Sequence, residues 1–178
     1  MHDELNERIR HIYQTYYKDV YSFLLYFTNN QNETEDLTQE VFTSVLRSLP
    51  NYDGRVVIKT WLFSIAKYVA IDYYRKQKLK LFFSEKLLRN TVTTEGVPEA
   101  ELSHKEDLVA LKKALQKLKP GFRMVIILRS IRGCSIKETA ELLAISEAKV
   151  KVDYHRGLKQ LQRYMTESTE GGWQNEFV

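Results

Sequence analysis

The chain has 178 residues, of which 43% are hydrophobic and 28% charged, and its formal net charge is +4. That length suffices for one globular domain or two small ones, and no apolar run approaches the ~20 residues of a membrane span. The polar N-terminus lacks the apolar core of a signal peptide, so we expect a cytoplasmic protein. The single cysteine, Cys134, excludes an internal disulfide framework, and the four histidines show no metal-ligand spacing. Because no nucleophile elbow, phosphate-binding glycine loop or HExxH pattern occurs either, we expect neither an enzyme nor a cofactor.

Charge is segregated along the chain. Residues 1–40 hold eight acids and three bases, whereas residues 41–90 hold ten bases and three acids. An acidic end and a basic middle favour a protein partner on one surface and a polyanion on another. Solvated faces that were segregated by chance would give the same pattern.

The first two expected helices carry apolar residues at helical spacing. In residues 9–29 the stripe is formed by Ile9, Ile12, Tyr16, Val20, Phe23 and Phe27. Asn32, followed by Glu35, resembles an N-terminal cap of the next helix, which ends before Pro50. Its stripe comprises Leu37, Val41, Val45 and Leu49, broadened by Phe42 and Leu46. We expect both stripes to lie in a core.

A third helix is predicted over residues 60–80, with Thr60 as its N-cap. Its apolar stripe comprises Leu62, Ile65, Val69 and Tyr73, and its other face carries Ser64, Lys67, Tyr68, Asp72 and Arg75. Cations beside an aromatic ring could take a phosphate and a stacked base, although a solvated basic helix has the same composition. From about residue 81 to 103 the periodicity weakens around Gly96 and Pro98, which predicts a linker. The basic and apolar start of that linker could alternatively lie on a membrane surface.

The second half ends in a helix-turn-helix pattern. An apolar stripe of Leu108, Leu111, Leu115 and Leu118 precedes a break at Pro120, and Val125, Ile126, Leu128 and Ile131 follow it. Ser135 with Glu138 forms a capping box, a break follows at Ala144, and Ser146 caps a final helix. That helix directs Val150, Tyr154, Leu158 and Leu161 inward and Lys149, Lys151, His155, Arg156 and Lys159 outward. This order is typical of a major-groove reader, and a three-helix packing unit with solvated lysines is the alternative.

Four stretches of the chain resemble an extracytoplasmic-function sigma factor of bacterial RNA polymerase and occur in that family's order. They are DLTQEVF, YDGR, KTWLFSIAKYVAIDYYRKQ and LKPGFRMVIILRSIRGCSIKETAELLAISEAKVKVDYHRGLKQL. The resemblance implies an all-α protein of two small helical domains joined by a flexible linker. Residues 1–80 would be region two, which binds core polymerase and melts the minus-ten element. Residues 81–104 would be the linker, residues 105–166 the region-four helix-turn-helix that reads the minus-thirty-five element, and residues 167–178 a disordered tail.

The resemblance also implies roles for individual residues. The core-polymerase-binding motif falls on Asp36, Leu37, Gln39, Glu40, Val41 and Phe42. The minus-ten surface falls on Lys67, Tyr68, Asp72, Arg75 and Lys76. Region-four DNA contacts fall on Arg129, Ser146, Lys149, Lys151 and Arg156, to which the outward face described above adds His155.

Four positions depart from the family pattern. Tyr68 stands where the family often has Asn, which favours stacking over a base-edge contact. Val152 and Asp153 stand where Ser and Arg are common, which removes one cation from the recognition helix. Ala144 occupies a turn position that is often Gly, where a left-handed backbone would cost about 1 kcal/mol.

The predicted function is therefore that of an alternative sigma factor. Its partners would be core RNA polymerase and promoter DNA, with an anti-sigma factor as a further candidate partner and no small-molecule substrate. A helix-turn-helix regulator that acts without polymerase is one alternative, and a helical module that sequesters another protein is a second. Only the first predicts promoter-specific initiation when the chain is added to purified core polymerase.

Overall fold

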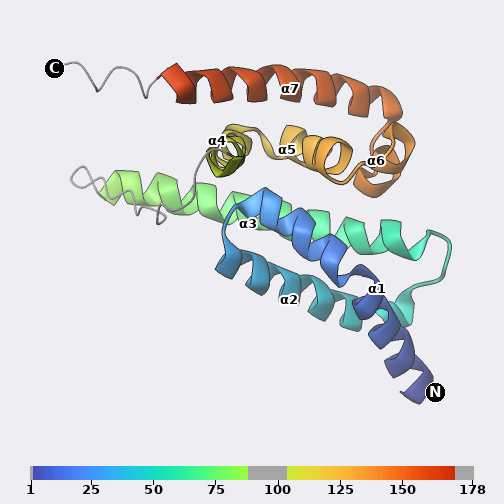
Figure 1. Cartoon of the computed structure of the whole chain (residues 1–178). Helices are drawn as coiled ribbons and strands as arrows, with labels where there is room; N and C mark the ends of the chain where they lie inside the picture. The colour runs from blue at the N-terminus through green and yellow to red at the C-terminus, as the bar shows by residue number, and fades with distance from the viewer. Residues whose placement is uncertain (1, 88–103, 171–178) are drawn as a thin grey trace.

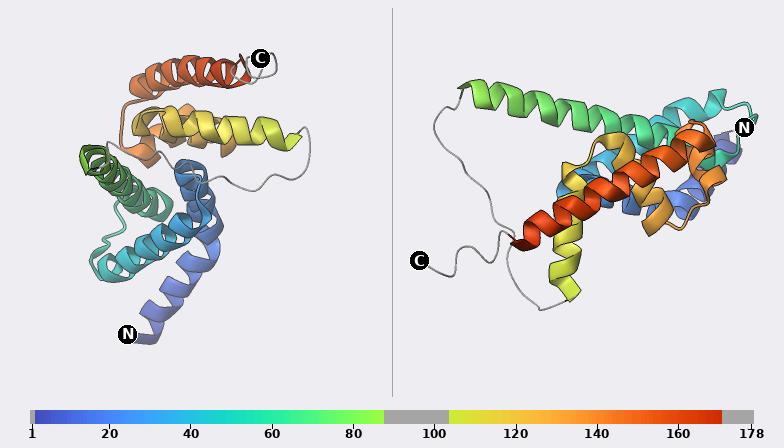
Figure 2. Two further views of the ribbon diagram at one scale, coloured as in Figure 1. Left: turned by 90° about the vertical axis from the view of Figure 1, so that its left-hand side faces the viewer. Right: turned by 90° about the horizontal axis from the view of Figure 1, so that it is seen from above.

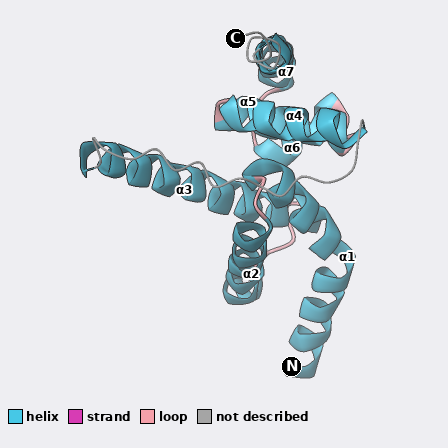
Figure 3. Ribbon diagram, turned by 60° about the vertical axis from the view of Figure 1, so that its left-hand side comes forward, coloured by secondary structure: helices cyan, strands magenta, loops and turns pink. Residues whose placement is uncertain are grey.

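The computed structural model describes residues 2–87 and 104–170, and within these ranges all regular structure is helical, as predicted (Figure 3). The elements are α1 (His2–Thr28), α2 (Gln31–Ser48), α3 (Ile58–Leu87), α4 (His104–Lys117), α5 (Pro120–Ile126), α6 (Ile136–Leu143) and α7 (Glu147–Glu170). A 3-10 turn, Leu49–Asn51, follows α2, and a π-helical turn, η2 (Ile127–Ile131), follows α5. None of the described helices is long and apolar enough to cross a membrane.

Helices α1, α2 and α3 form a three-helix unit (Figure 1). The predicted apolar stripes supply its core, because Val20, Phe23, Val41 and Leu62 are fully or almost fully buried. The Phe23 ring meets the Phe63 ring edge-on at 5.7 Å between centroids, which locks α1 against α3. The core assignment of all three stripes is confirmed in outline.

Three local predictions in this unit were wrong. The N-cap of α2 is Asn30, whose extended backbone lets its side chain accept a hydrogen bond from the Glu33 amide at 3.2 Å, whereas Asn32 lies inside the helix. Helix α3 begins at Ile58, so Thr60 is a helical residue and not its cap. Leu46 is exposed, because it lies at the solvent edge of the α2 stripe.

The helix-turn-helix consists of α6 and α7 and confirms the predicted capping. The Ser135 hydroxyl accepts a hydrogen bond from the Glu138 amide, and the Glu138 carboxylate accepts one from the Ser135 amide. Ala144 ends α6 in the left-handed conformation, with φ 51° and ψ 51°. The Ser146 hydroxyl then accepts from the Lys149 amide at 3.1 Å, which caps α7.

The inward face of α7 is rotated from the predicted stripe. Val150 and Leu161 are buried as predicted, and Tyr154 is partly buried. Leu158, however, is 37% exposed, whereas Asp153 and Gly157 are buried. The cause lies at Gly157, because a Cβ added there would come within 3.0 Å of Ile126 Cδ1 on α5. The missing side chain lets α5 and α7 approach closely, and it sets which face of α7 points inward.

The two halves pack against each other. Helices α4, α5 and α6 form a layer between α7 and the α1–α3 unit, as two views agree (Figures 1 and 2). Helix α6 lies on α3, and α4 lies on α1. One buried cluster contains Phe27 and Val69 from the N-terminal half together with Leu128 and Leu143 from the C-terminal half. The sequence predicted two helical units but did not predict this shared core.

Two predicted boundaries moved. Helix α3 continues through Leu87, so residues 81–87 of the expected linker are helical, because the first helix-breaking residues come only at Gly96 and Pro98. Helix α7 continues to Glu170, so residues 167–170 of the expected tail are helical too. The remaining linker residues, 88–103, and tail residues, 171–178, lie outside the described residues.

Candidate nucleic-acid interface

The outward face of α7 is cationic. The residues predicted to face outward are all exposed, as a surface that reads DNA requires: Ser146, Lys149, Lys151, His155 and Arg156. These side chains come from the first three turns of α7, next to the turn after α6. In a helix-turn-helix this end of the second helix meets base edges and phosphates.

Asp153 modifies this face in a way that its residue type alone did not indicate. Its side chain lies in the buried stripe, and residue 153 is only 6% exposed. The Lys149 ammonium donates to Asp153 Oδ2 at 2.7 Å, one turn along the helix. Because Asp153 neutralises and orients Lys149, the freely available cations on this part of the face are Lys151 and Arg156.

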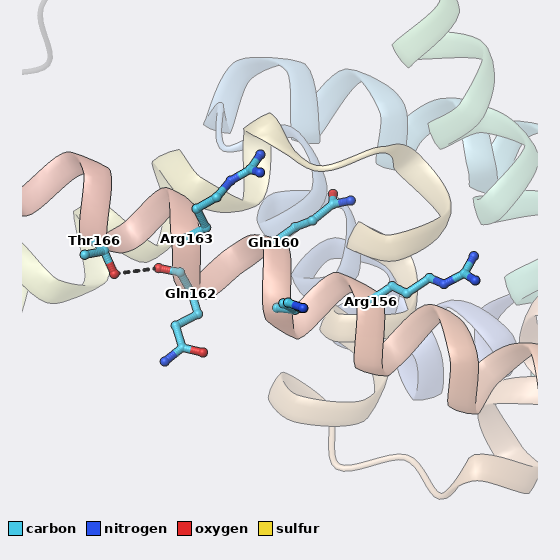
Figure 4. A pocket seen from close by; sticks show the side chains of 6 residues that line it. Arg156, Gln160, Gln162, Arg163 and Thr166 are labelled. Carbon is cyan, nitrogen blue, oxygen red and sulfur yellow. Dashed lines mark hydrogen bonds between the residues drawn. The ribbon is translucent and has the colours of Figure 1, made fainter.

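The cationic surface continues beyond the predicted residues. A shallow hollow of about 500 Å³ runs along α7 (Figure 4) and is lined by Arg156, Lys159, Gln160, Gln162, Arg163 and Thr166. The Thr166 hydroxyl donates to the Gln162 carbonyl at 3.0 Å, which fixes one end of the hollow. Guanidinium and amide groups on an open surface suit a phosphate backbone better than an enclosed small molecule. Arg163 was missed, although its seven-residue spacing from Arg156 would have placed it on the same face.

Arg129 is turned inward in this structure. It lies on η2, its Nη1 donates to the Cys134 carbonyl, and its guanidinium lies 5.4 Å from the centroid of the Tyr154 ring. The Tyr154 hydroxyl is also 3.0 Å from the Ser130 hydroxyl. Arg129 thus ties η2 to the loop before α6 and to α7, and the hydrogen bond to Cys134 occupies its Nη1.

On α3 the aromatic and cationic face is partly occupied. Tyr68 is 69% exposed and Arg75 is exposed, which confirms that the Tyr68 ring is accessible. Asp72 pairs with Lys76 at 2.6 Å. The Lys67 ammonium, however, donates to the Leu143 carbonyl of α6 at 2.5 Å. The contact between the two halves therefore uses one of the predicted DNA-binding residues.

The loop before α3 presents two exposed valines, Val56 and Val57. The Tyr52 hydroxyl donates to the Val56 carbonyl, and Asp53 pairs with Arg55 at 3.1 Å. The Tyr52 ring in turn packs on Trp61 at 4.9 Å between centroids, so Trp61 is partly buried and supports the fold. Exposed apolar side chains on an ordered loop can pack against unstacked bases, and sequence reasoning did not identify them.

The predicted polymerase-binding motif on α2 divides into two groups. Asp36, Gln39 and Glu40 are exposed, whereas Leu37, Val41 and Phe42 are buried and hold α2 on its neighbours. Apolar contact area on this surface therefore has to come from other residues. Tyr13, whose ring lies 4.8 Å from that of Phe42, and Leu46, one turn after Phe42 on α2, are about half exposed.

Tyr17 adjoins the same surface. Its ring lies 4.9 Å from that of Tyr13 and 6.0 Å from that of Phe42. Burial raises the pKa of the Tyr17 hydroxyl above its ordinary value, and Tyr13, Tyr21 and Glu35 add to this effect. The acidic helix is thus bordered by neutral aromatic rings.

Both halves of the chain match known protein families. Residues 12–80 match the family model Sigma-70 region 2, and residues 108–161 match the model Sigma-70, region 4. The chain is 40% identical over 168 residues to the ECF RNA polymerase sigma factor SigX of Bacillus subtilis, covering 90% of this chain and 85% of that protein. It is 34% identical over 167 residues to the RNA polymerase sigma factor YlaC of the same organism, covering 92% and 95%.

Two solved structures share the fold. The sigma factor RpoE in complex with the anti-sigma factor NepR from Bartonella quintana matches with a TM-score of 0.68 at 21% identity, covering 90% of this chain and 98% of that one. CnrH in complex with the cytosolic domain of CnrY matches with a TM-score of 0.66 at 20% identity, covering 91% and 90%.

Proposed function

The chain belongs to the extracytoplasmic-function family of RNA polymerase sigma factors, and we propose that it directs core polymerase to promoters through three surfaces on α2, α3 and α7. Helix α2 docks on core polymerase. Helix α7 reads the minus-thirty-five element in duplex DNA. Helix α3 and the loop before it hold the unpaired minus-ten strand.

The observation that carries this proposal is that two exposed faces of different chemistry occur in one chain, each suited to a different form of nucleic acid. The α7 face offers exposed cations at the start of a capped recognition helix, which suits duplex DNA. The α3 face offers the accessible Tyr68 ring beside the exposed Arg75, which suits stacked, unpaired bases. A helix-turn-helix regulator that binds duplex DNA alone would need the first surface and have no use for the second.

The third surface of the proposal lies on α2 and would bind core polymerase. Asp36 and Glu40 are exposed carboxylates that can steer a basic partner and fix its register. Tyr13 and Leu46 add half-exposed apolar area near Phe42 of α2, of the kind that dominates binding energy at interfaces. In this proposal the chain performs no chemistry of its own, acts in the cytoplasm and is open to control by an anti-sigma factor.

Reconstitution with purified core polymerase tests the proposal. The full chain is mixed with core enzyme and fragmented genomic DNA, and the 5′ ends of the transcripts are mapped. We expect initiation at a limited set of sites that share sequence near positions minus thirty-five and minus ten, absent with core enzyme alone. Duplex DNA binding without such initiation would favour the regulator, and binding of neither DNA nor polymerase would favour an interaction module.

A further inference from the structure

One cation on the outward face of α7 is held by a carboxylate from the buried face of the same helix. Lys149 lies in the first turn of α7, where its backbone amide donates to the Ser146 hydroxyl that caps the helix. Its ammonium donates to Asp153 Oδ2 at 2.7 Å, so the side chain runs along the helix toward the next turn. The Lys149 side chain is 57% exposed, whereas that of Asp153 is only 8% exposed. The ammonium therefore stays open to a ligand while its carboxylate partner does not.

Stability alone does not account for this pair. Removing a carboxylate from water costs free energy that an ion pair seldom recovers in full. An ion pair four residues apart also stabilises a helix less when the base precedes the acid, as Lys149 precedes Asp153, than in the reverse order. Aspartate is a poor helix former in addition. Position 153 lies in the buried stripe between Val150 and Gly157, where an apolar residue would contribute more to folding on each of these grounds.

The pairing limits what Lys149 can bind. An unpaired lysine on a DNA-reading face is a flexible point charge that neutralises a phosphate at any sequence. The charge of Lys149 is instead balanced by Asp153, and one of its three N–H groups has a fixed direction. The other two can serve a ligand whose acceptors lie at a matching position.

Guanine offers such acceptors. It presents O6 and N7 side by side in the major groove, and lysine is one of the two side chains that most often bind them. The first turns of a recognition helix are the part that reaches base edges. Lys149 occupies the first turn of α7, so its position and its restricted charge both favour a base edge over the phosphate backbone.

We propose that Asp153 is a specificity-determining residue, which withdraws the charge of Lys149 from the phosphate backbone and directs its ammonium to a guanine edge in the minus-thirty-five element. Asp153 does not touch DNA, because it is buried, and it acts as a positioning residue through Lys149. This inference rests on the proposed function for the name of the element, but reading of a guanine can be measured on duplex DNA without transcription.

Four variants of the full chain separate the roles of the two side chains. Asp153→Asn removes the carboxylate charge at nearly constant shape, and Lys149→Met removes the ammonium but keeps an apolar stem. The double variant removes both charges, so it keeps the wild-type net charge and leaves no unpaired carboxylate in the buried stripe. Glu141→Gln removes an exposed acid of α6 and controls for the change in net charge.

The DNA is chosen by the protein itself. Duplexes are selected from a random-sequence pool by the wild-type chain, alone and in parallel bound to core polymerase. Fluorescence anisotropy then measures the affinity of each variant for the selected duplex and for a scrambled one at several salt concentrations. Each guanine of the selected duplex is replaced in turn by 7-deazaguanine, which lacks the N7 acceptor. Thermal melting of each variant reports its stability.

The salt dependence reports the charge of Lys149. On the scrambled duplex, Asp153→Asn should steepen the slope of log affinity against log salt by about 0.9, because a released Lys149 then neutralises one more phosphate. The double variant and Glu141→Gln should keep the wild-type slope.

The ratio of the two affinities reports base reading. Discrimination between the selected and scrambled duplexes should fall about tenfold in Asp153→Asn, which corresponds to ~1.4 kcal/mol. The double variant should lose about as much and not twice as much, because the two side chains act as one unit. At one guanine, 7-deazaguanine should weaken the wild type and leave Lys149→Met and the double variant unaffected.

Three results would overturn the proposal. If Asp153→Asn changes affinity for both duplexes by the same factor and no 7-deazaguanine effect depends on Lys149, the pair only sets the local charge. If Asp153→Asn melts at a lower temperature but discriminates as the wild type does per folded molecule, the pair is structural. If the pool yields no preferred duplex, α7 reads no base edges. Transcripts mapped from wild-type holoenzyme test the sigma-factor assignment separately, so the two failures remain distinguishable.

Discussion

Substituting Ala144 by glycine should stabilise the protein. Ala144 has φ 51° and ψ 51° at the turn between α6 and α7, and its side chain is exposed, so no packing is lost with the methyl group. The left-handed conformation costs an L-residue about 1–2 kcal/mol, whereas glycine adopts it freely. Glycine also gives the unfolded chain more freedom, which costs about 0.4–1 kcal/mol. The difference predicts a gain of roughly 0.5–1 kcal/mol for Ala144→Gly.

Gly133 provides the matched reverse experiment. Its φ is +66°, and a Cβ added there would have no described neighbour within 4 Å, so the cost of Gly133→Ala is one of backbone conformation alone. By the same terms this variant should lose roughly 0.5–1 kcal/mol. Asn29, with φ 55°, is an intermediate case because asparagine tolerates the left-handed region, and Asn29→Gly should change stability little.

Urea denaturation measures the free energy of unfolding of the three variants, and thermal melting measures their melting temperatures. For a chain of this size 1 kcal/mol moves the melting temperature by about 2–4 °C, so Ala144→Gly and Gly133→Ala should shift it in opposite directions. Affinity for a minus-thirty-five duplex should not change, since neither residue reaches the outward face of α7. If Ala144→Gly lost stability, the methyl group of Ala144 would have to make stabilising contacts that outweigh the strain of the left-handed backbone, and the reasoning from strain would be refuted.

Three further predictions concern the proposed surfaces. Asp36→Arg with Glu40→Arg should weaken core-polymerase binding in a pull-down while leaving the melting temperature unchanged, and unaltered affinity in the folded protein would remove α2 from that interface. Loss of a bidentate base contact typically costs about 1–3 kcal/mol of binding free energy, whereas loss of a phosphate contact mainly lowers the salt dependence of binding. DNA-binding titrations of Lys151→Ala and Arg156→Ala at several salt concentrations should therefore assign each side chain to one of these roles. If neither substitution has an effect, a different face of α7 reads DNA. Tyr68→Ala should reduce permanganate-reactive promoter about tenfold, as expected for a stacking contact of ~1–3 kcal/mol, with stability intact; normal melting by a less stable variant would make the ring structural.

Much of the local structure could be predicted because it depends on neighbours in the sequence. The capping box of Ser135 and Glu138, the cap at Ser146 and the accessible ring of Tyr68 all follow from spacing of three or four residues. The buried positions of the three N-terminal stripes follow from helical periodicity in the same way. These signals involve a single helix, so tertiary packing seldom overrides them.

Two helix starts were placed wrongly within a single segment, at Asn32 and Thr60. The errors of larger consequence arose where two helices meet. Gly157 brings α5 onto α7 and rotates the inward face so that Asp153 is buried and Leu158 is exposed, which a regular stripe cannot reveal. Arg123 was assigned no role, because a lone arginine in an apolar helix looks the same whether it faces solvent or the carbonyl end of another helix. Its partner, the Phe27 carbonyl, is 96 residues away in the sequence. Contacts of that separation leave no periodic trace.

The core shared by the two halves also gives their separation a thermodynamic signature. Phe27 and Val69 belong to the same buried cluster as Leu128 and Leu143 of the other half, so any separation of the halves transfers apolar surface to water. Exposure of apolar surface raises the heat capacity, whereas burial of surface against a partner lowers it. If the halves separate when a partner docks, the heat-capacity change of binding is the sum of two opposing terms. It is then less negative than for a partner that binds the packed halves without separating them, so calorimetry distinguishes the two cases.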